Sequence, residues 1–586
     1  MERSYCGFID IESVDETLNI KGWVNTRRDH GGVIFIDLRD HTGLVQVVFN
    51  PEEKEIFEAA QAIRSEYVLE ICGLVKKRLD GTYNPEMSTG KIEIIAKKLT
   101  ILNISKTTPF KVNDESTNED LRLQYRYVDL RSNYMQANLR FRSKLFSVIR
   151  NHLGDLEFNE IETPILTKPT PEGARDYIVP SRVHKGSFFA LPQSPQLFKQ
   201  MLMISGLDKY YQIAKCFRDE DLRADRQPEF TQLDIECSFY DEEDIMCLSE
   251  SLMQKIFSEL IDKDIILNFP KITFKESIEK YGCDKPDLRN PLHLVDISAH
   301  LVNTEFKVFK DCINNPDKRI VALNIPGGSK LTRKNIDDYT DTVKTFGAKG
   351  LAYFKIEDLS DTDKGISSPI KKFLSSDEIN KIIKSVKPSN GDLIFFSADT
   401  ADVVNNSMST LISKIGADLD LIKSGFKFAW IVDYPMFEYE KGTKNLTSLH
   451  HPFTSPVSNS QDFNDKTLSR AYDLTLNGNE IGGGSVRIHE KSEQLKVFQA
   501  LKLTDSEIDS KFGFFLKSLE YGCPPHAGIA FGLDRIVMLL RNLNSIRDTI
   551  AFPKTQSSSC LLTEAPTEID LEQLKELAIK TNKPKT

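Results

Sequence analysis

The sequence predicts a multidomain α+β protein, and three observations lead to this fold class. A chain of 586 residues is too long for a single hydrophobic core. Residues 1–105 alternate apolar and polar positions as short strands do, while 135–153 carry an apolar stripe at helical spacing. Strand patterns on both sides of a charged segment at 219–228 predict an antiparallel hairpin in the middle of the chain.

The N-terminal region is predicted to form a small Greek-key barrel of the OB type. It combines a short helix at 52–63 with five strands, at 18–25, 33–38, 44–49, 67–75 and 91–99. Ile34, Ile36 and Leu38 would fill the barrel, which leaves Phe35 on the outside near Arg28. An outward ring beside a cation suits unstacked bases, and a ring covered by a neighbouring domain fits these residues equally well.

The segments that follow alternate between polar connections and helices. Residues 106–130 are polar and are predicted to be a linker. The helix at 135–153 leads to a strand at 159–162, and Pro164 favours a sheet edge because proline donates no ladder hydrogen bond. A loop with a charged tip is expected at 167–180. Further helices are expected at 194–202, where Gln196 and Lys199 share a face, and at 244–261.

The central hairpin is predicted to form the floor of a polar pocket. Its return strand alternates two sets of side chains, Leu233, Ile235 and Cys237 on one face and Gln232, Asp234 and Glu236 on the other. Arg218 joins the polar face from the incoming strand. Its planar guanidinium suits an α-phosphate. An exposed hairpin whose charges pair with each other is the alternative.

The C-terminal third holds the other candidate ligands. Asp473 and Glu480 offer the hard oxygen atoms that Mg²⁺ prefers. His450 and His451 are adjacent but lack a third ligand at zinc spacing. Glu480 lies seven residues before Arg487, so a bulge within 482–484 is expected if both serve one pocket.

A strand is expected to end at Gly532, and the helix that follows carries Arg535 in its first turn. A helix N-terminus beside an arginine could bind an anion. A core helix with an incidental arginine is the alternative interpretation. The net charge of −10 argues against a protein that binds nucleic acid with its whole surface. The nine cysteines are scattered and form no CxxC motif, which predicts a reducing, cytoplasmic location. The N-terminus lacks the apolar stretch of a signal peptide, and no apolar run approaches about 20 residues, so no membrane contact is expected.

Several motifs carry a resemblance that covers nearly the whole chain. FRDEDLRADRQPEFTQLD resembles motif 2 of the class II aminoacyl-tRNA synthetases, in the form found in bacterial aspartyl-tRNA synthetases. GIAFGLDRIVMLL resembles motif 3 and FNEIETPIL resembles motif 1. TPEGARDY, QSPQLFKQ, HHPFTSP and EIGGGSVRIH are further signatures of that family.

The resemblance implies a division of the chain and a reaction. It implies an OB-fold anticodon-binding domain at 1–105, a linker at 106–130, catalytic segments at 131–288 and 420–555, an inserted α/β domain of the GAD type at 289–419 and a C-terminal extension at 556–586. The implied activity is ATP- and Mg²⁺-dependent activation of L-aspartate and its transfer to tRNA(Asp). Motif 1 implies a homodimer.

The resemblance also implies roles for individual residues. Arg218, Glu220 and Arg535 would be catalytic. ATP would be bound by Arg218, Asp219, Glu220, Gln227, Glu480, Gly532, Leu533, Asp534 and Arg535. Aspartate would be bound by Glu172, Ser194, Gln196, Lys199, Arg218, Asp234, His450 and Arg487. Asp473 and Glu480 would hold Mg²⁺, and Arg28, Phe35 and Gln46 would contact the anticodon.

Three alternatives follow from the same residues. Asparaginyl- and lysyl-tRNA synthetases share the barrel and the three motifs, but the insertion and TPEGARDY favour aspartate. A noncatalytic tRNA-binding relative would be expected to lose Arg218 or Arg535, and class I enzymes would show HIGH and KMSKS.

His30, Gly31 and Gly81 are assigned to tRNA discrimination, and they leave open whether tRNA(Asn) is also charged.

Overall fold

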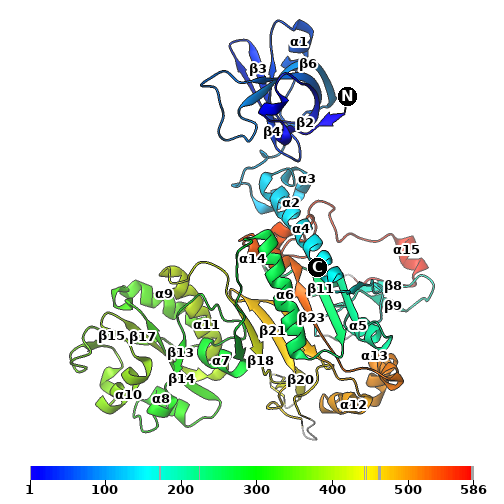
Figure 1. Ribbon diagram of the computed structural model, residues 1–586. Coiled ribbons are helices and arrows are strands. Elements are labelled where there is room, and N and C mark those ends of the chain that lie inside the picture. Colours follow the sequence, from blue (N-terminus) through cyan, green and yellow to red (C-terminus); the bar gives the residue numbers. More distant parts are fainter. Residues whose placement is uncertain are drawn as a thin grey trace. The chain divides into compact units, whose positions relative to one another are not determined.

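The computed structural model describes residues 2–169, 173–222, 225–440, 442–443, 445–458 and 463–582 (Figure 1). The chain divides into two compact units, Met1–Tyr134 and Met135–Thr586. Both the mixed α+β class and the N-terminal barrel predicted from the sequence are confirmed. Among the described residues, no helix combines the length and the apolar composition of a membrane span.

The first unit contains a closed β-barrel. Its elements are β1 (Arg3–Ser4), β2 (Thr17–His30), β3 (Val33–Arg39), β4 (Leu44–Phe49), α1 (Lys54–Gln61), β5 (Val68–Lys77) and β6 (Ile92–Asn103). The strand order is β1-β2-β3-β4-β6-β5, and an additional pairing of β2 with β5 closes the sheet. An irregularity in β2 between Val24 and Thr26 bends the strand toward its second partner. Ile34, Ile36 and Leu38 lie in the barrel core, as predicted.

The segment predicted to be a linker ends in two short helices, α2 (Glu119–Gln124) and α3 (Arg126–Asp129). Asn118 caps α2, and Arg122 and Arg126 both pair with Asp129. Ion pairs hold this turn of chain together along with the buried Leu123 and Val128, which form no continuous apolar stripe. Apolar periodicity therefore missed it.

The second unit is built on an eight-stranded sheet. Its strands in spatial order are β12 (Lys271–Thr273), β18 (Phe428–Val432), β21 (Ala471–Leu476), β22 (Asn479–Val486), β23 (His526–Gly532), β11 (Glu229–Ser238), β10 (Lys209–Phe217) and β7 (Asn159–Glu160). The pairings are antiparallel except at the two ends, where β12 and β7 run parallel to their neighbours. The short strand β7 lies at the edge, as Pro164 indicated.

Three helices cover one face of this sheet: α4 (Asn133–Asp155), α6 (Glu242–Leu260) and α14 (Leu533–Leu540) (Figure 1). Leu233, Ile235 and Cys237 of β11 pack against them, as their alternation predicted. The alternate residues therefore point to the opposite face. Burying one face of an antiparallel sheet leaves the other free for polar chemistry.

The opposite face carries rows of polar and very small residues. Asp234 pairs with Ala530, which pairs with Gly483, which pairs with Asp473, so one row crosses four strands. The next row joins Glu236, Gly528, Ser485 and Ala471 in the same way. A Cβ atom at Gly528 would lie 1.9 Å from Glu236 Oε2, which explains why no side chain stands there.

The predicted bulge exists, but its predicted position was wrong. The ladder between β21 and β22 is regular through Gly482, Gly483 and Gly484, and the register shift lies just before them. Leu474 faces Gly482 while Thr475 faces Glu480, so Ile481 is the extra residue. The shift brings Glu480 onto the same face as Arg487. Ile481 packs into the core, which fixes the irregularity at an apolar residue rather than in the glycine run.

Residues 294–418 form a three-layer α/β segment. Its sheet has the order β13 (Leu294–Asp296), β14 (Lys318–Ile325), β17 (Leu393–Thr400), β15 (Ala352–Ile356) and β16 (Ile366–Ser367). Helices α9 (Arg333–Lys344) and α11 (Ala401–Asp418) cover one face, and α8 (Lys307–Ile313) and α10 (Ser376–Val386) cover the other (Figure 1).

The remaining elements surround the main sheet. They are β8 (Ile178–Pro180), β9 (Phe188–Ala190), α5 (Gln196–Ile204), α7 (Phe274–Tyr281), β19 (Phe437–Tyr439), β20 (Leu446–Ser448), α12 (Lys491–Ala500), α13 (Asp505–Ser518) and α15 (Leu571–Glu576). Short 3-10 helices lie at Cys6–Phe8, Ile11–Ser13, Ser298–His300, Gly328–Lys330, Lys371–Phe373, Leu519–Tyr521 and Ile546–Thr549.

Candidate active site

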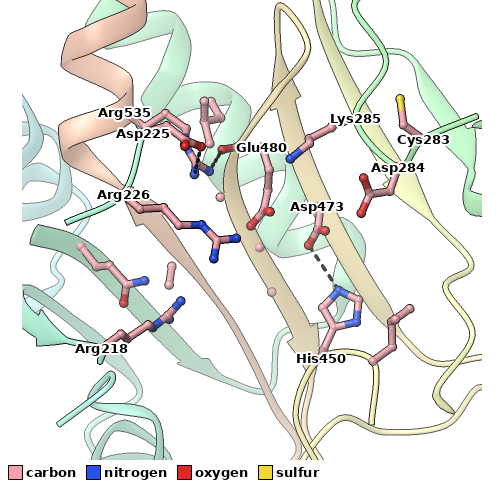
Figure 2. A pocket seen from close by; sticks show the side chains of 18 of the residues that line it. Arg218, Asp225, Arg226, Cys283, Asp284, Lys285, His450, Asp473, Glu480 and Arg535 are labelled. Carbon is pink, nitrogen blue, oxygen red and sulfur yellow. Dashed lines mark hydrogen bonds and ion pairs between the residues drawn. The ribbon is translucent and has the colours of Figure 1, made fainter. Parts of the chain in front are cut away.

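A pocket of about 1030 Å³ lies over the polar face of the main sheet. Figure 2 shows Arg218, Arg226 and Arg535 on one side of it, with Asp473 and Glu480 near its middle. The structure brings most of the predicted residues to this pocket: Ser194, Gln196, Lys199, Arg218, Glu220, Gln227, Asp234, His450, Asp473, Glu480, Arg487, Gly532, Asp534 and Arg535. Arg218 and Arg535, which are far apart in sequence, line one cavity.

The inner part of the pocket holds a buried network of charges. Lys199 Nζ lies 3.0 Å from Asp234 Oδ1 and 3.4 Å from Glu236 Oε2. Arg487 donates to Glu236 through Nε at 2.8 Å and through Nη2 at 3.1 Å. Two cations and two carboxylates therefore neutralise each other, and none of the four side chains is more than 2% exposed.

Burial and pairing move the pKa values of these carboxyls in opposite directions. Burial raises the pKa of Asp234, because its pairing with Lys199 offsets only part of the desolvation. Burial also opposes ionisation of Glu236, but Arg487 and Lys199 outweigh it and lower the pKa of that carboxyl. Glu236 is thus the firmly ionised member of the network.

His451 completes the network from the other side of Arg487. Its Nε2 lies 2.8 Å from Arg487 Nη1. An arginine only donates, so Nε2 must be an unprotonated acceptor and the ring must be neutral. Burial and the Arg487 charge both lower the pKa of His451, which agrees with this assignment.

The outer part of the pocket holds two carboxylates that fit a hard cation. A Cβ on Gly483 would lie 2.7 Å from Asp473 Oδ1 and 3.5 Å from Glu480 Oε1, so the two carboxylates flank the same glycine. Asp473 Oδ1 is buried and makes no hydrogen bond with the described residues, although His450 Nε2 lies 3.5 Å from it as an ion-pair neighbour. The Asp473 charge and burial both raise the pKa of Glu480. Within the described ranges, no cluster of three or more His, Cys, Asp or Glu residues could hold a metal by itself.

Two guanidinium groups face this outer part. The Arg218 side chain lies over the Phe230 ring, 5.0 Å from its centre. Arg535 donates to Glu480 O and lies 3.3 Å from Asp225 Oδ2. Each keeps a buried Nε that makes no hydrogen bond to the described part of the chain. Buried unsatisfied donors indicate where ligand atoms bind.

Two family models match the chain. The model of the class II tRNA synthetases (D, K and N) matches residues 118–556, and that of the OB-fold nucleic acid binding domain matches 18–102. The chain belongs to the class II tRNA synthetases.

Relatives of this synthetase match it over its full length. It is 53% identical over 585 residues to the aspartate--tRNA(Asp/Asn) ligase of Legionella pneumophila strain Corby, covering 99% of each chain. The corresponding ligase of strain Philadelphia 1 is 52% identical with the same coverage.

Solved structures share the fold of the synthetase. The asparaginyl-tRNA synthetase of Pyrococcus horikoshii matches with a TM-score of 0.60 at 20% identity, covering 95% of this chain and 98% of that one. The aspartyl-tRNA synthetase of Entamoeba histolytica matches with a TM-score of 0.57 at 18% identity, covering 94% and 91%.

Some predicted residues of the synthetase have side chains that are bound within the protein or lie outside the pocket. Leu533 is fully buried in the sheet core, so the predicted ATP contact could come only from its backbone. Asp534 pairs with Arg142 and accepts from Thr231 N at 2.8 Å, so its carboxylate ties α14 to the sheet. Asp219 is exposed outside the pocket. Glu172 lies outside the described residues.

Gln227 and Glu220 line the pocket but also have partners in the protein. Both ends of the Gln227 amide bond the backbone of Lys554, at 3.0 and 2.8 Å. Glu220 Oε2 accepts from Arg226 at 2.9 Å. Gln227, at the end of the charged segment at 219–228, is thereby tied to Lys554.

The predicted anticodon residues lie together on the barrel. Arg28 donates to Asp37 Oδ1 at 2.8 Å and to Gln46 Oε1 at 3.2 Å, and Gln46 donates to Glu93. Phe35 is half-buried, with its ring centre 6.4 Å from that of His30. Gly31 and Gly81 are exposed and have φ angles of 62° and 85°, which favour glycine.

The sequence placed Glu236 on the polar face but assigned it no function. It also assigned no function to His451. The alternation along β11 was the signal for Glu236. For His451, only the structure shows which of the two adjacent histidines reaches Arg487. His450 lies instead 3.5 Å from Asp473, and although burial opposes its protonation, Asp473 raises its pKa.

Proposed function

We propose that this synthetase is an aspartate–tRNA ligase, which activates L-aspartate with ATP and transfers it to the 3′ end of tRNA(Asp). The unsatisfied buried atoms of the pocket carry the proposal: Gln196 Nε2, Arg218 Nε, Asp234 Oδ2, Asp473 Oδ1 and Arg535 Nε. All five residues line one pocket, some in the charge network and some beside the outer arginines. One cavity thus offers unsatisfied partners both to an amino acid and to a nucleotide. The names of the relatives support aspartate.

The amino acid would lie in the inner part. Asp234 has one carboxylate oxygen bound by Lys199 and the other unbonded, so Oδ2 would accept from the α-ammonium of the substrate. Lys199 and Arg487 would meet the side-chain carboxylate. Since Glu236 already pairs with Arg487, the cations are not left unpaired when asparagine binds. Selection for aspartate would therefore depend on hydrogen-bond geometry as well as on charge.

The chemistry needs no nucleophile from the protein. The substrate carboxylate attacks the α-phosphate, and Arg218 would stabilise the charge that develops there. Arg535 would hold the terminal phosphate, and Glu220 and Gln227 would contact the nucleotide. Asp473 and Glu480 would bind Mg²⁺, which when present neutralises phosphate charge. Positioning and charge stabilisation would supply most of the acceleration.

The test is aspartate-dependent exchange between ATP and pyrophosphate, followed by aspartylation of purified tRNA. Activation by aspartate but not by asparagine or lysine is expected. Exchange that responds equally to asparagine would defeat the assignment. Aspartylation of tRNA(Asp) and tRNA(Asn), scored side by side, decides the second substrate. The relatives named aspartate--tRNA(Asp/Asn) ligase favour both tRNAs, and we assign the discrimination to the exposed loop at His30 and Gly31.

We propose further that the protein is a cytoplasmic homodimer. All nine cysteines are free, which suits a reducing compartment. Ile165 and Leu166, beside the edge strand β7, are half exposed, and Ile178 of the nearby β8 is 60% exposed. An apolar patch of this kind suits a subunit interface. Light scattering of the purified protein would measure the assembly state.

A further inference from the structure

The wall of the pocket opposite the arginines comes from outside the recognised motifs. It consists of the turn after α7, with Asp284 and Lys285, and one side of α11, with Asn405, Asn406 and Ser409. Figure 2 shows the Lys285 ammonium directed toward Glu480 from the side opposite Arg218 and Arg535. The pocket thus has cations on two facing walls.

Lys285 has the properties of a ligand-binding side chain. Within the described residues its ammonium makes no hydrogen bond or ion pair, although it lines a pocket with several carboxylates. Lys285 is an exposed side chain of the pocket lining, and its ammonium is directed toward the Glu480 carboxylate (Figure 2). It is therefore placed to meet a ligand that lies between this wall and the arginines.

The turn that carries Lys285 is braced by residues of the inserted segment. Gly282 ends α7 with φ 69°, and a Cβ there would lie 2.6 Å from Asn405 O of α11. Ser277 holds the turn from inside by donating to Cys283 O at 2.7 Å. The turn therefore has little freedom to move away from α11.

Arg319 of β14 connects the same parts. Its Nη2 donates to Glu279 O at 2.9 Å, and its Nη1 donates to Ile278 O at 3.3 Å and to Asn405 Oδ1 at 2.9 Å. A cation at the C-terminus of α7 is favourable both for the exposed carbonyls and for the helix dipole. One guanidinium thus fixes α7 against α11.

We propose that Lys285 binds the phosphates of ATP and that the inserted segment positions Lys285 through Arg319. The inference rests on the proposed function for the identity of the nucleotide. Lys285 is then a catalytic residue that meets the substrate from the wall facing Arg535. Arg319 is a positioning residue, which acts only through the turn at 282–285. This gives the insertion a task inside the active site.

The experiment compares Lys285→Met, Arg319→Lys and the double variant in the full-length protein. The matched control is Lys280→Met, because Lys280 is an exposed lysine of α7 that pairs with Glu276 at 2.6 Å. Two quantities are measured: the Kd for ATP with Mg²⁺ by calorimetric titration, and the KM values for ATP and aspartate in pyrophosphate exchange.

Loss of one charge-assisted phosphate contact should raise the Kd and the KM for ATP about tenfold in Lys285→Met. The KM for aspartate should stay unchanged, and Lys280→Met should match the wild type. Arg319→Lys should raise the KM for ATP about threefold, and it should add almost nothing in the Lys285→Met background. A purely structural role of Arg319 would instead change both KM values.

An unchanged Kd for ATP in Lys285→Met would overturn the inference. Independent, multiplying effects of the two substitutions would overturn the positioning role of Arg319. If the wild type shows no aspartate-dependent exchange while Lys285→Met still weakens ATP binding, the proposed function fails and the role of Lys285 stands.

Discussion

In the inner half of the pocket Lys199 and Arg487 are each paired with a buried carboxylate, whereas in the outer half Arg218 and Arg535 each keep a buried Nε without a partner. The inner charges balance one another before any ligand arrives. The outer half depends on a ligand to complete its hydrogen bonds. The difference shows how one sheet face can hold a charge-balanced cluster beside donors that have no partner in the described protein.

The largest effect is expected from Arg487→Leu in the inner half. Aspartate activation should fall about a thousandfold, because the substrate loses a preorganised charged donor. Glu236 would be left buried beside Lys199 alone, so the free energy of unfolding should fall by about 3–5 kcal/mol. Pyrophosphate exchange and urea unfolding measure the two effects.

Glu236→Gln combined with Arg487→Leu is the control for this variant. It removes one charge of each sign, so most of the lost stability should return while activation stays low. Near-normal exchange in Arg487→Leu would remove Arg487 from the aspartate site. Equal stability of the single and double variants would contradict the charge-balanced description of the inner half.

Arg218→Lys should have a smaller and purely functional effect. A lysine keeps the charge but loses the fork that bonds two phosphate oxygens, so kcat/KM for ATP should fall about a hundredfold. Stability should hardly change, since a lysine can keep the cation–ring contact with Phe230. Arg150→Lys, at an exposed pair with Glu160, is the control and should leave exchange unaltered. An equal loss in both variants would argue against a phosphate ligand.

The glycines of the two halves offer a third comparison. Alanine at Gly528 would place Cβ 1.9 Å from Glu236 Oε2 and 2.3 Å from Ile235 O, in a network that cannot yield. Alanine at Gly483 would meet only the end of a side chain, Asp473 Oδ1 at 2.7 Å, which would have to shift against its hydrogen bond from Tyr434. Gly528→Ala should therefore lower the free energy of unfolding by about 2–3 kcal/mol, and Gly483→Ala should lower it by about 1 kcal/mol. Denaturant unfolding of the two variants would contradict the comparison if their losses were equal.

The sequence predicted which face of a strand each side chain occupies better than it predicted which distant side chains meet. Period-two alternation correctly assigned Ile34 to the barrel core and Ile235 to the sheet core, because alternation depends only on local backbone geometry. It could not pair Glu236 with Arg487, which are 251 residues apart and meet only through the order of the strands. For the same reason it placed the bulge in the glycines rather than at Ile481. Lys285 lay outside every motif, and only the packing of α11 brings it to the pocket.

His451 is expected to contribute to the pH dependence of stability. Its pKa is lowered in the folded protein, while an unfolded histidine has a pKa of about 6.5. Below pH 6.5 the unfolded state therefore binds more protons, so acidification favours unfolding. Between pH 6.5 and 5 the contribution of His451 should fall by up to about 1.4 kcal/mol per pH unit.

The measurement is urea unfolding at several pH values, in the wild type and in His451→Gln. The variant should lose this part of the slope, while His293→Gln, at an exposed histidine, should follow the wild-type curve. If His451→Gln keeps the wild-type slope, the ring is not held neutral by Arg487. The inner half would then owe its balance to Lys199, Asp234 and Glu236 without help from the histidine.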